Sequence, residues 1–114
     1  MIDHKEIEKY ILSFNGARLD YPFGESTAVY KIGESQDAKM FALIAENTKP
    51  IRLSLKCDPN LSEVLQAQYE TVLPGFHLNK KNWITIICTG QLPYEDIKSL
   101  IINSYKLVSG EKTN

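Results

Sequence analysis

The chain has 114 residues, a formal net charge of −1 at pH 7 and 43% hydrophobic residues, as in ordinary globular proteins. This length is close to the commonest size of one domain, so we expect a single domain over residues 1–114. The near-neutral charge argues against a dedicated, strongly basic nucleic-acid module. Because no stretch approaches a membrane span and the first residues lack the apolar run of a signal peptide, we expect a cytoplasmic protein. We separately favour a monomer.

The first part of the chain predicts a helix followed by a shaped turn. Four apolar residues recur at the spacing of one helix face, namely Ile7, Tyr10, Ile11 and Phe14. Asp3 and Glu6 have the spacing of a capping pair, and Asn15-Gly16 predicts the helix end. The segment Y-P-F-G-E at 21–25 then predicts a turn. We expect Phe23 to fill the edge of the core there, with a binding role as the alternative.

Three strand patterns follow, at residues 27–32, 39–46 and 50–57. The second is almost entirely apolar, which favours a central strand covered on both faces. The third alternates strictly, with Ile51, Leu53 and Leu55 on one side and Arg52, Ser54 and Lys56 on the other. The connectors are short and polar, so we expect antiparallel hairpins.

The second half of the chain predicts helix, strand and helix. Asp58-Pro59 is a strong helix start, and the apolar stripe of that helix is Leu61, Val64, Leu65 and Tyr69. Residues 83–89 alternate as a strand. Pro93 begins the last helix, Gly110 ends it, and Leu100 and Ile101 are expected to face the sheet. The order is α-β-β-β-α-β-α, which predicts an α+β fold with three helices and an antiparallel sheet of at least four strands.

The connector from Pro74 to Trp83 is the strongest candidate for function. It reads P-G-F-H-L-N-K-K-N-W and ends at the only tryptophan of the chain. Loops held by a rigid scaffold commonly carry binding residues. We expect His77 to hold this loop in shape and to do no chemistry, and catalysis by His77 as a general base is the alternative.

Basic residues gather in two stretches that contain no acidic residue. Residues 47–57 include Arg52 and Lys56, and residues 71–94 include Lys80 and Lys81. These four cations are the candidate phosphate contacts of a weak nucleic-acid site, with DNA as the first partner considered. Asn79 and Trp83 could add polar contact or stacking. The alternative is a solvated strand face, with Asn79 capping a turn and Trp83 as a half-buried anchor.

The sequence gives little support for an enzyme. Cys57 and Cys88 each end a predicted strand without a CxxC spacing, so we expect buried thiols in a reducing compartment. Only two histidines are present, and no glycine-rich phosphate loop follows a strand. We therefore expect no catalytic residue, no bound metal and no cofactor.

Five segments resemble one family in the order expected for it. They are Y-P-F-G-E (21–25), K-M-F-A-L-I (39–44), S-L-K-C-D-P (54–59), H-L-N-K-K-N-W-I-T (77–85) and S-Y-K-L-V (104–108). Together they make the chain similar to the MmcQ/YjbR family, with no visible departure from its pattern. The resemblance implies a compact α+β domain similar to the "double wing" domain of a phage transcription activator. It implies a DNA-binding role by analogy of fold, and no enzymatic activity is established for the family.

A second function class remains open beside nucleic-acid binding. The aromatic residues Phe23, Phe76 and Trp83, with Tyr21 nearby, could line a groove for a protein or small-ligand partner. The two classes differ in salt dependence, because phosphate binding weakens steeply with salt whereas apolar burial does not.

Overall fold

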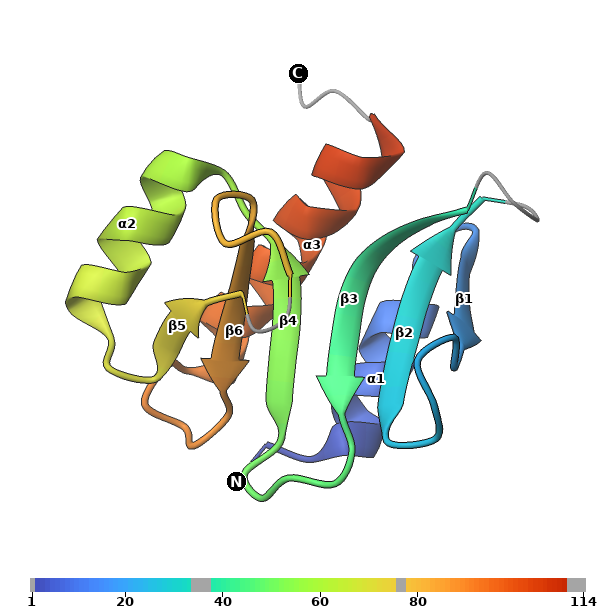
Figure 1. Ribbon diagram of the computed structural model, residues 1–114, viewed down its shortest axis with the longest axis horizontal. Coiled ribbons are helices and arrows are strands. Elements are labelled where there is room, and N and C mark those ends of the chain that lie inside the picture. The colour runs from blue at the N-terminus through green and yellow to red at the C-terminus, as the bar shows by residue number, and fades with distance from the viewer. Residues whose placement is uncertain (1, 34–37, 76–77, 111–114) are drawn as a thin grey trace.

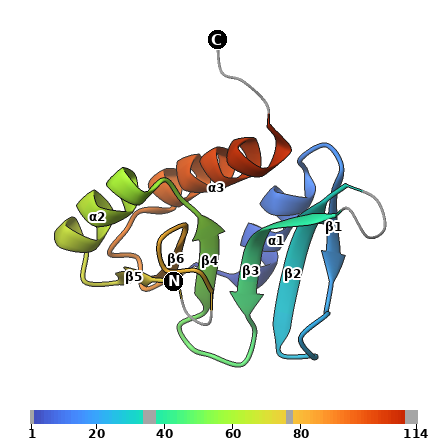
Figure 2. The ribbon, with the colours of Figure 1, turned by 45° about the horizontal axis from the view of Figure 1, so that its top comes forward.

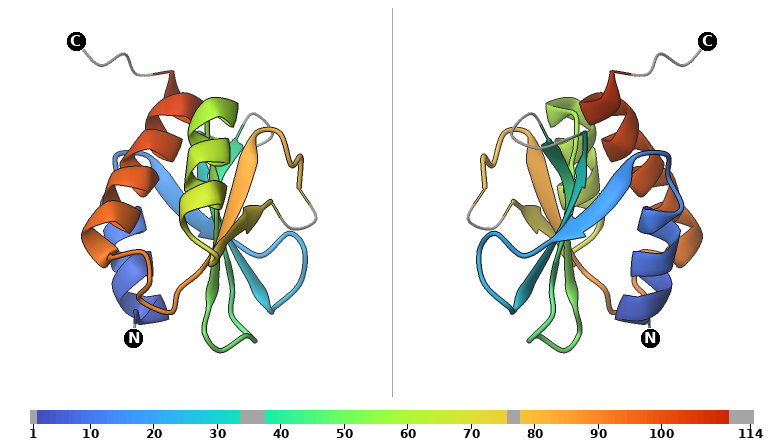
Figure 3. Two further views of the ribbon diagram at one scale, coloured as in Figure 1. Left: turned by 90° about the vertical axis from the view of Figure 1, so that its left-hand side faces the viewer. Right: turned by 90° about the vertical axis from the view of Figure 1, so that its right-hand side faces the viewer.

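The fold is built on one antiparallel sheet with the helices packed against one of its faces (Figures 1 and 3). The structure is a computed structural model that describes residues 2–33, 38–75 and 78–110. Over these residues the elements are α1 (His4–Leu12), β1 (Ala17–Asp20), β2 (Thr27–Ile32), β3 (Lys39–Ala45), β4 (Arg52–Lys56), α2 (Pro59–Gln68), β5 (Val72–Pro74), β6 (Trp83–Ile87) and α3 (Tyr94–Ser109).

The expected α+β fold is confirmed, and the sheet is larger than the minimum expected. Within the described residues it has six strands in the order β1-β2-β3-β4-β6-β5, and every neighbouring pair is antiparallel. The sequence patterns did not reveal β1 or β5, so the full order is α-β-β-β-β-α-β-β-α. Both are edge strands, and β1 is mostly exposed while β5 has three residues. Neither gives the repeated apolar alternation by which a strand is recognised.

The sequence predicted residues at several helix ends, and those of α2 and α3 agree with the structure. The Asp58 carboxylate accepts hydrogen bonds from the backbone N–H groups of Asn60 and Leu61, with Pro59 at the first helical position, as predicted. Gly110 ends α3 in the left-handed conformation, also as predicted. Asp3 is the N-cap residue of α1, as predicted, but its side chain makes no capping bond. The helix ends at Leu12, so the end predicted at Asn15-Gly16 is wrong. Among the described helices none is long and apolar enough to cross a bilayer.

The main core lies between the sheet and the helices. Helix α3 packs on β3 and β4, α2 on β5, and α1 on β1 (Figure 2). Ile97 and Ile101 of α3 are fully buried, whereas Leu100 is only partly buried. Leu100 therefore sits at the margin of the contact that it was expected to share with Ile101. Val64, expected in the α2 stripe, is 57% exposed, and Ser62 is buried in that helix instead.

A hydroxyl group joins α3 to the centre of the sheet. The Ser104 hydroxyl donates to the carbonyl of Phe41 in β3 and accepts from the backbone N–H of Lys56 in β4, at 2.9 Å. One buried side chain thus satisfies backbone groups of two neighbouring strands. This bridge fixes β4, the strand that carries Arg52 and Lys56, against the helical layer.

The opposite face of the sheet carries a second, smaller apolar cluster. Val29, Leu43 and Trp83 are buried there, with Met40 and Leu78 packed against them. The expectation that residues 39–46 are covered on both faces is therefore confirmed, since β3 contributes Phe41 to one cluster and Leu43 to the other. We call this face, which no described helix covers, the open face.

Candidate functional site

The open face is hollowed into a groove of about 560 Å³. The loop between β1 and β2 and the loop between β5 and β6 both project on this side, away from the helices (Figure 3). The first loop contributes Phe23 and the second contributes Leu78. The groove thus lies on the sheet between two projecting loops. Its described lining consists of Phe23, Ser26, Thr27, Leu43, Ala45, Asn47, Thr48, Arg52, Ser54, Leu78 and Thr85.

Strand register places the floor of the groove. Ser54 of β4 pairs with Leu43 of β3 on one side and with Thr85 of β6 on the other. The Ser54 and Thr85 hydroxyls are hydrogen-bonded at 2.8 Å, and both residues are buried. The predicted alternation of β4 is confirmed, because Leu53 and Leu55 enter the main core on the other face. Arg52 and Ser54 consequently belong to one surface.

The chemistry of the lining is mixed. Hydroxyl and amide groups alternate with apolar side chains, and Arg52 supplies a cation. None of the described lining residues carries a carboxylate. Such a surface is suited to an anionic or polar ligand that also has an apolar part, because it offers one charge, several hydrogen-bond donors and apolar contact.

Phe23 is not where the sequence led us to expect it. Its ring is 61% exposed at the groove, so the expectation that it fills the edge of the core is wrong. Pro22 and Gly24, which has a φ of 108°, shape the turn that holds it outward. An exposed aromatic ring on a shaped loop offers a large apolar surface for contact with a ligand. The alternative named from the sequence is therefore the one that the geometry favours.

Trp83 lies deeper than a stacking residue would. It pairs with Lys56 across β4 and β6, but its side chain is only 8% exposed and packs in the smaller cluster. Lys56 itself is partly buried. Trp83 therefore acts as an anchor of the open face, and Phe23 offers the exposed ring.

The loop from β5 to β6 is closed at its base by a close backbone approach. The Gly75 N–H donates to the Trp83 carbonyl at 2.9 Å, and a Cβ placed on Gly75 would lie 2.6 Å from the Trp83 Cβ. Within the loop, the Asn79 side chain accepts from the Lys81 N–H at 3.0 Å. Asn79 therefore caps a turn, as the alternative interpretation held, and the side chains of Lys80 and Lys81 are exposed.

Two residues singled out in this loop, Phe76 and His77, lie outside the described residues, so the structural role of His77 stays a prediction. The two cysteines are described, and both are buried and free, as expected. Burial, with a smaller effect of the neighbouring Asp58, raises the pKa of Cys57 to about 11. Burial likewise raises the pKa of Cys88 to about 11. Neither thiol has the exposure or the lowered pKa of a reactive cysteine.

The structure brings together part of the predicted site. Arg52 and Lys56 share one face of β4, and the described part of the β5–β6 loop, residues 78–82, lies on the same side of the sheet and includes the exposed Lys80 and Lys81. Sequence reasoning missed Ser54, Thr85 and Leu78 as lining residues. The alternation of the two strands contained the signal for the first two, since each shares a face with a candidate residue. No sequence signal gave the pairing of the strands.

Comparison with known proteins places the chain in a family. The sequence model of the YjbR family matches residues 12–107. The chain is 32% identical to YbdF, an uncharacterised protein of Escherichia coli O157:H7, over 92% of its own length and 83% of that protein. It is 29% identical to the uncharacterised Bacillus subtilis protein YyaQ, over 94% of this chain and 98% of the relative.

A solved structure agrees with these matches. The crystal structure of the Deinococcus radiodurans protein DR2400, which contains the domain DUF419, superposes with a TM-score of 0.87 at 33% identity. The superposition covers 96% of this chain and 80% of the other. The family match and the fold agree with the five segments that first suggested the resemblance, and the chain belongs to the YjbR family.

Proposed function

We propose that this protein is a weak nucleic-acid-binding module whose ligand lies on the open face. The observation that carries the proposal is the groove itself, with Arg52 in a described lining that holds no carboxylate. Arg52 and Lys56 on β4, and Lys80 and Lys81 on the loop beside it, supply the phosphate contacts. Such contacts give affinity and position without reading sequence.

The shape of the groove favours single-stranded DNA or RNA over an intact duplex. Proteins that bind single strands combine a basic groove with aromatic rings on which bases stack. Because Trp83 is buried, the ring available for stacking is that of Phe23. The hydroxyl groups of Ser26 and Thr27 in the groove can hydrogen-bond to the Watson–Crick edge of a base, which an intact duplex keeps paired.

The expected affinity is low and strongly dependent on salt. Four phosphate contacts predict a log–log salt slope of about −2.8 for a single strand, since each contributes about −0.7, and about −3.6 for a duplex. The net charge of −1 supplies no long-range attraction. We therefore expect dissociation constants of about 10⁻⁴–10⁻⁶ M.

Fluorescence polarisation of labelled single-stranded and duplex oligonucleotides, in low and in moderate salt, tests the proposal. We expect binding in low salt, stronger for the single strand, and loss of that binding in the double variant Lys80→Glu/Lys81→Glu. The matched control is Lys5→Glu/Lys9→Glu on α1, which makes the same change of charge at two exposed lysines of the helical layer. Absence of binding in low salt, or equal loss in both variants, contradicts the proposal.

A protein or small-ligand partner is the second candidate function. The observation that favours it is the exposure of Phe23 beside Leu43 and Leu78, which makes part of the groove apolar. The affinity of a partner bound through apolar contacts depends little on salt concentration. A partner that binds equally in low and moderate salt, and that competes with no oligonucleotide, would replace the first proposal with this one.

A further inference from the structure

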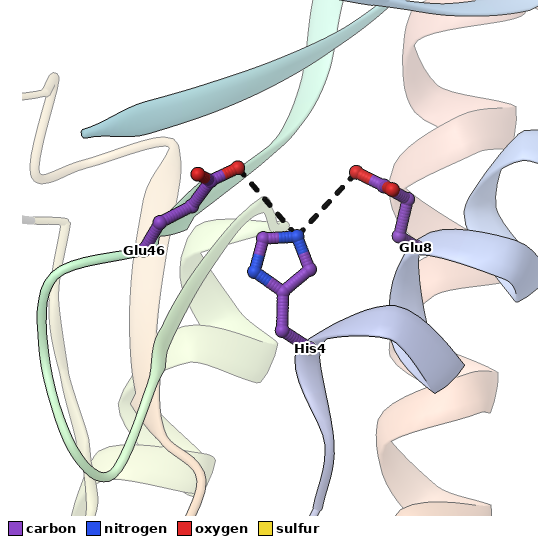
Figure 4. A group of neighbouring side chains, drawn as sticks. All are labelled: His4, Glu8 and Glu46. Atoms are coloured by element: carbon purple, nitrogen blue, oxygen red, sulfur yellow. Dashed lines mark hydrogen bonds and ion pairs between the residues drawn. The ribbon is translucent and has the colours of Figure 1, made fainter. Parts of the chain in front are cut away.

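A histidine and two glutamates from separate parts of the chain meet beside the helical layer. His4 and Glu8 lie one turn apart on α1, and Glu46 follows β3 (Figure 4). The His4 Nε2 atom is 3.4 Å from a Glu8 oxygen and 3.6 Å from a Glu46 oxygen. All three ligand-type atoms lie within 4.8 Å of one another. We call these residues the His4 cluster.

The two separations from His4 Nε2 match edges of a metal coordination shell, and the third, between the Glu8 and Glu46 oxygens, is at most 4.8 Å. With bonds of about 2.0–2.2 Å to nitrogen and oxygen, two ligands of a tetrahedral Zn²⁺ ion lie about 3.3–3.5 Å apart. The two distances from His4 Nε2 are close to this value, and Figure 4 shows both carboxylates directed at that nitrogen. The spacing of His4 and Glu8, four residues apart, is also the spacing by which one helix face presents two ligands to one ion.

Two tyrosines hold the carboxylate oxygens that face the imidazole. The Tyr21 hydroxyl donates to Oε1 of Glu46 at 2.8 Å, and the Tyr30 hydroxyl donates to Oε2 of Glu8. These are the same two oxygen atoms that approach His4 Nε2. Hydrogen bonds to the ligand side chains are how proteins orient a metal site and tune its affinity. Tyr30 is fully buried, so one of these supports is rigidly placed.

The cluster is sheltered and still open to an ion. The side chains of His4, Glu8 and Glu46 are 21%, 25% and 27% exposed. An ion can therefore enter from solvent and keep a water molecule as a further ligand, as in zinc sites with three protein ligands. Two carboxylates would also neutralise the charge of a divalent cation.

We propose that His4, Glu8 and Glu46 form a binding site for a divalent transition-metal ion of the Zn²⁺ type. An imidazole nitrogen in the set selects such ions over Mg²⁺, which prefers oxygen ligands and water. The ion joins the first turn of α1 to the end of β3. The expectation of no metal relied on the presence of only two histidines, and no local pattern in the sequence brings Glu46 beside His4. This site is separate from the groove, so the proposal stands or falls without the nucleic-acid proposal.

The simpler interpretation is that a proton takes the place of the metal, with a protonated His4 bridging the two carboxylates. The two interpretations differ in one measurable property, which is the response of the folded protein to Zn²⁺. The full chain is freed of metal with EDTA and exchanged into buffer at pH 7.5. Its melting temperature is then measured as Zn²⁺ is added, with Mg²⁺ in a parallel series.

We expect Zn²⁺ at a hundredfold excess over its dissociation constant to raise Tm by about 10 °C, with no rise in Mg²⁺. His4→Gln, Glu8→Gln and Glu46→Gln should each remove most of the rise. Tyr21→Phe, which deletes only an orienting hydroxyl, should weaken the affinity by about tenfold or more. The matched control is Glu6→Gln, an exposed glutamate of the same helix turn that should retain the full response.

Isothermal titration with Zn²⁺ at 25 °C keeps the test valid for variants of lower stability, and Trp83 fluorescence checks that each is folded. Titration of the folded wild type should show one ion bound per chain. The proposal is overturned if Zn²⁺ neither binds nor raises Tm. It is equally overturned if the response survives in His4→Gln, which would place the ion at the cysteines or elsewhere.

Discussion

The hydroxyl groups of Ser54 and Thr85 face each other across β4 and β6, 2.8 Å apart, in the floor of the groove. Both residues are buried, so their mutual hydrogen bond replaces contact with water. On this face the pair lies between the cross-strand pairs Arg52–Ile87 and Lys56–Trp83. It thereby gives the groove a polar floor between the apolar cluster and Arg52.

Removing one member of this pair should destabilise the protein more than removing both. Thr85→Val keeps the shape of the side chain but takes the partner from the Ser54 hydroxyl, and we expect a loss of about 1–3 kcal/mol in the free energy of unfolding. Adding Ser54→Ala to Thr85→Val should recover part of this loss, because no hydroxyl is then left buried. Urea unfolding followed by Trp83 fluorescence gives both values. A double variant that is less stable than Thr85→Val would contradict the assignment.

Gly75 should tolerate no side chain, because Trp83 lies too close to it. A Cβ on Gly75 would stand 2.6 Å from the Trp83 Cβ and 3.0 Å from its carbonyl oxygen. Gly75→Ala must therefore push β5 and β6 apart at the base of the loop, at a cost of about 1–3 kcal/mol. The control is Lys81→Ala, an exposed change in the same loop, which should leave stability within about 0.5 kcal/mol. Chemical denaturation measures the free energy of unfolding of both variants. If Gly75→Ala is as stable as Lys81→Ala, the close approach of Gly75 to Trp83 is refuted.

The sequence predicted the elements with strong periodicity and missed those without it. Strand β4 could be recognised, even to its two faces, because Leu53 and Leu55 alternate with Arg52 and Lys56 over its whole length. Strands β1 and β5 lie at the edges of the sheet, where β1 has no buried residue and β5 is only three residues long. Strands this exposed or this short contain too few alternating apolar positions to be recognised from the sequence.

Sequence reasoning predicted only those parts of the candidate site that a single helix or strand determines by itself. Arg52 and Lys56 follow from the two-residue period of a single strand. Phe23 was misplaced, because a shaped turn predicts where the backbone bends and not which side chain points outward. The meeting of His4 with Glu46 depends on the packing of α1 beside the end of β3, and no local pattern specifies such a contact.

Stability should fall in alkaline solution because of the two buried thiols. Their pKa is raised to about 11, whereas an exposed cysteine has a pKa near 9.0. As the pH rises, the unfolded chain therefore loses its thiol protons before the folded chain does. The contribution of each thiol is complete below pH 9 and is lost as the pH rises towards 11, at up to about 1.4 kcal/mol per pH unit.

Urea unfolding at a series of pH values from 8 to 11, followed by far-UV circular dichroism in the presence of a reductant, measures this slope. The variant Cys57→Ala/Cys88→Ala should start from a lower stability, because two small cavities are created, but should show a shallower decline. Tyr30, whose pKa burial also raises, remains in both proteins and adds the same loss at the highest pH. Parallel declines in the two proteins would show that the thiols do not contribute.

Phe23 offers a test of how the groove is used, because its ring is exposed and its removal should not disturb folding. We expect Phe23→Ala to leave the free energy of unfolding within about 0.5 kcal/mol of the wild type. If a base stacks on this ring, the affinity for a single-stranded oligonucleotide should fall by about 1–3 kcal/mol, or about 5-fold to 150-fold. The salt slope should stay unchanged, because no phosphate contact is lost. Lys81→Ala, which removes one proposed phosphate contact, should weaken binding and make the single-strand slope shallower by about 0.7.

Two further variants complete this comparison. Phe23→Tyr keeps an aromatic ring and should retain most of the affinity. Leu107→Ala removes an exposed apolar side chain from α3, on the helical side of the sheet, and should have no effect on binding. Polarisation titrations at four salt concentrations give affinity and slope for each protein. An affinity that is the same in Phe23→Ala and in the wild type would exclude stacking on this ring and leave only the phosphate contacts of the basic residues.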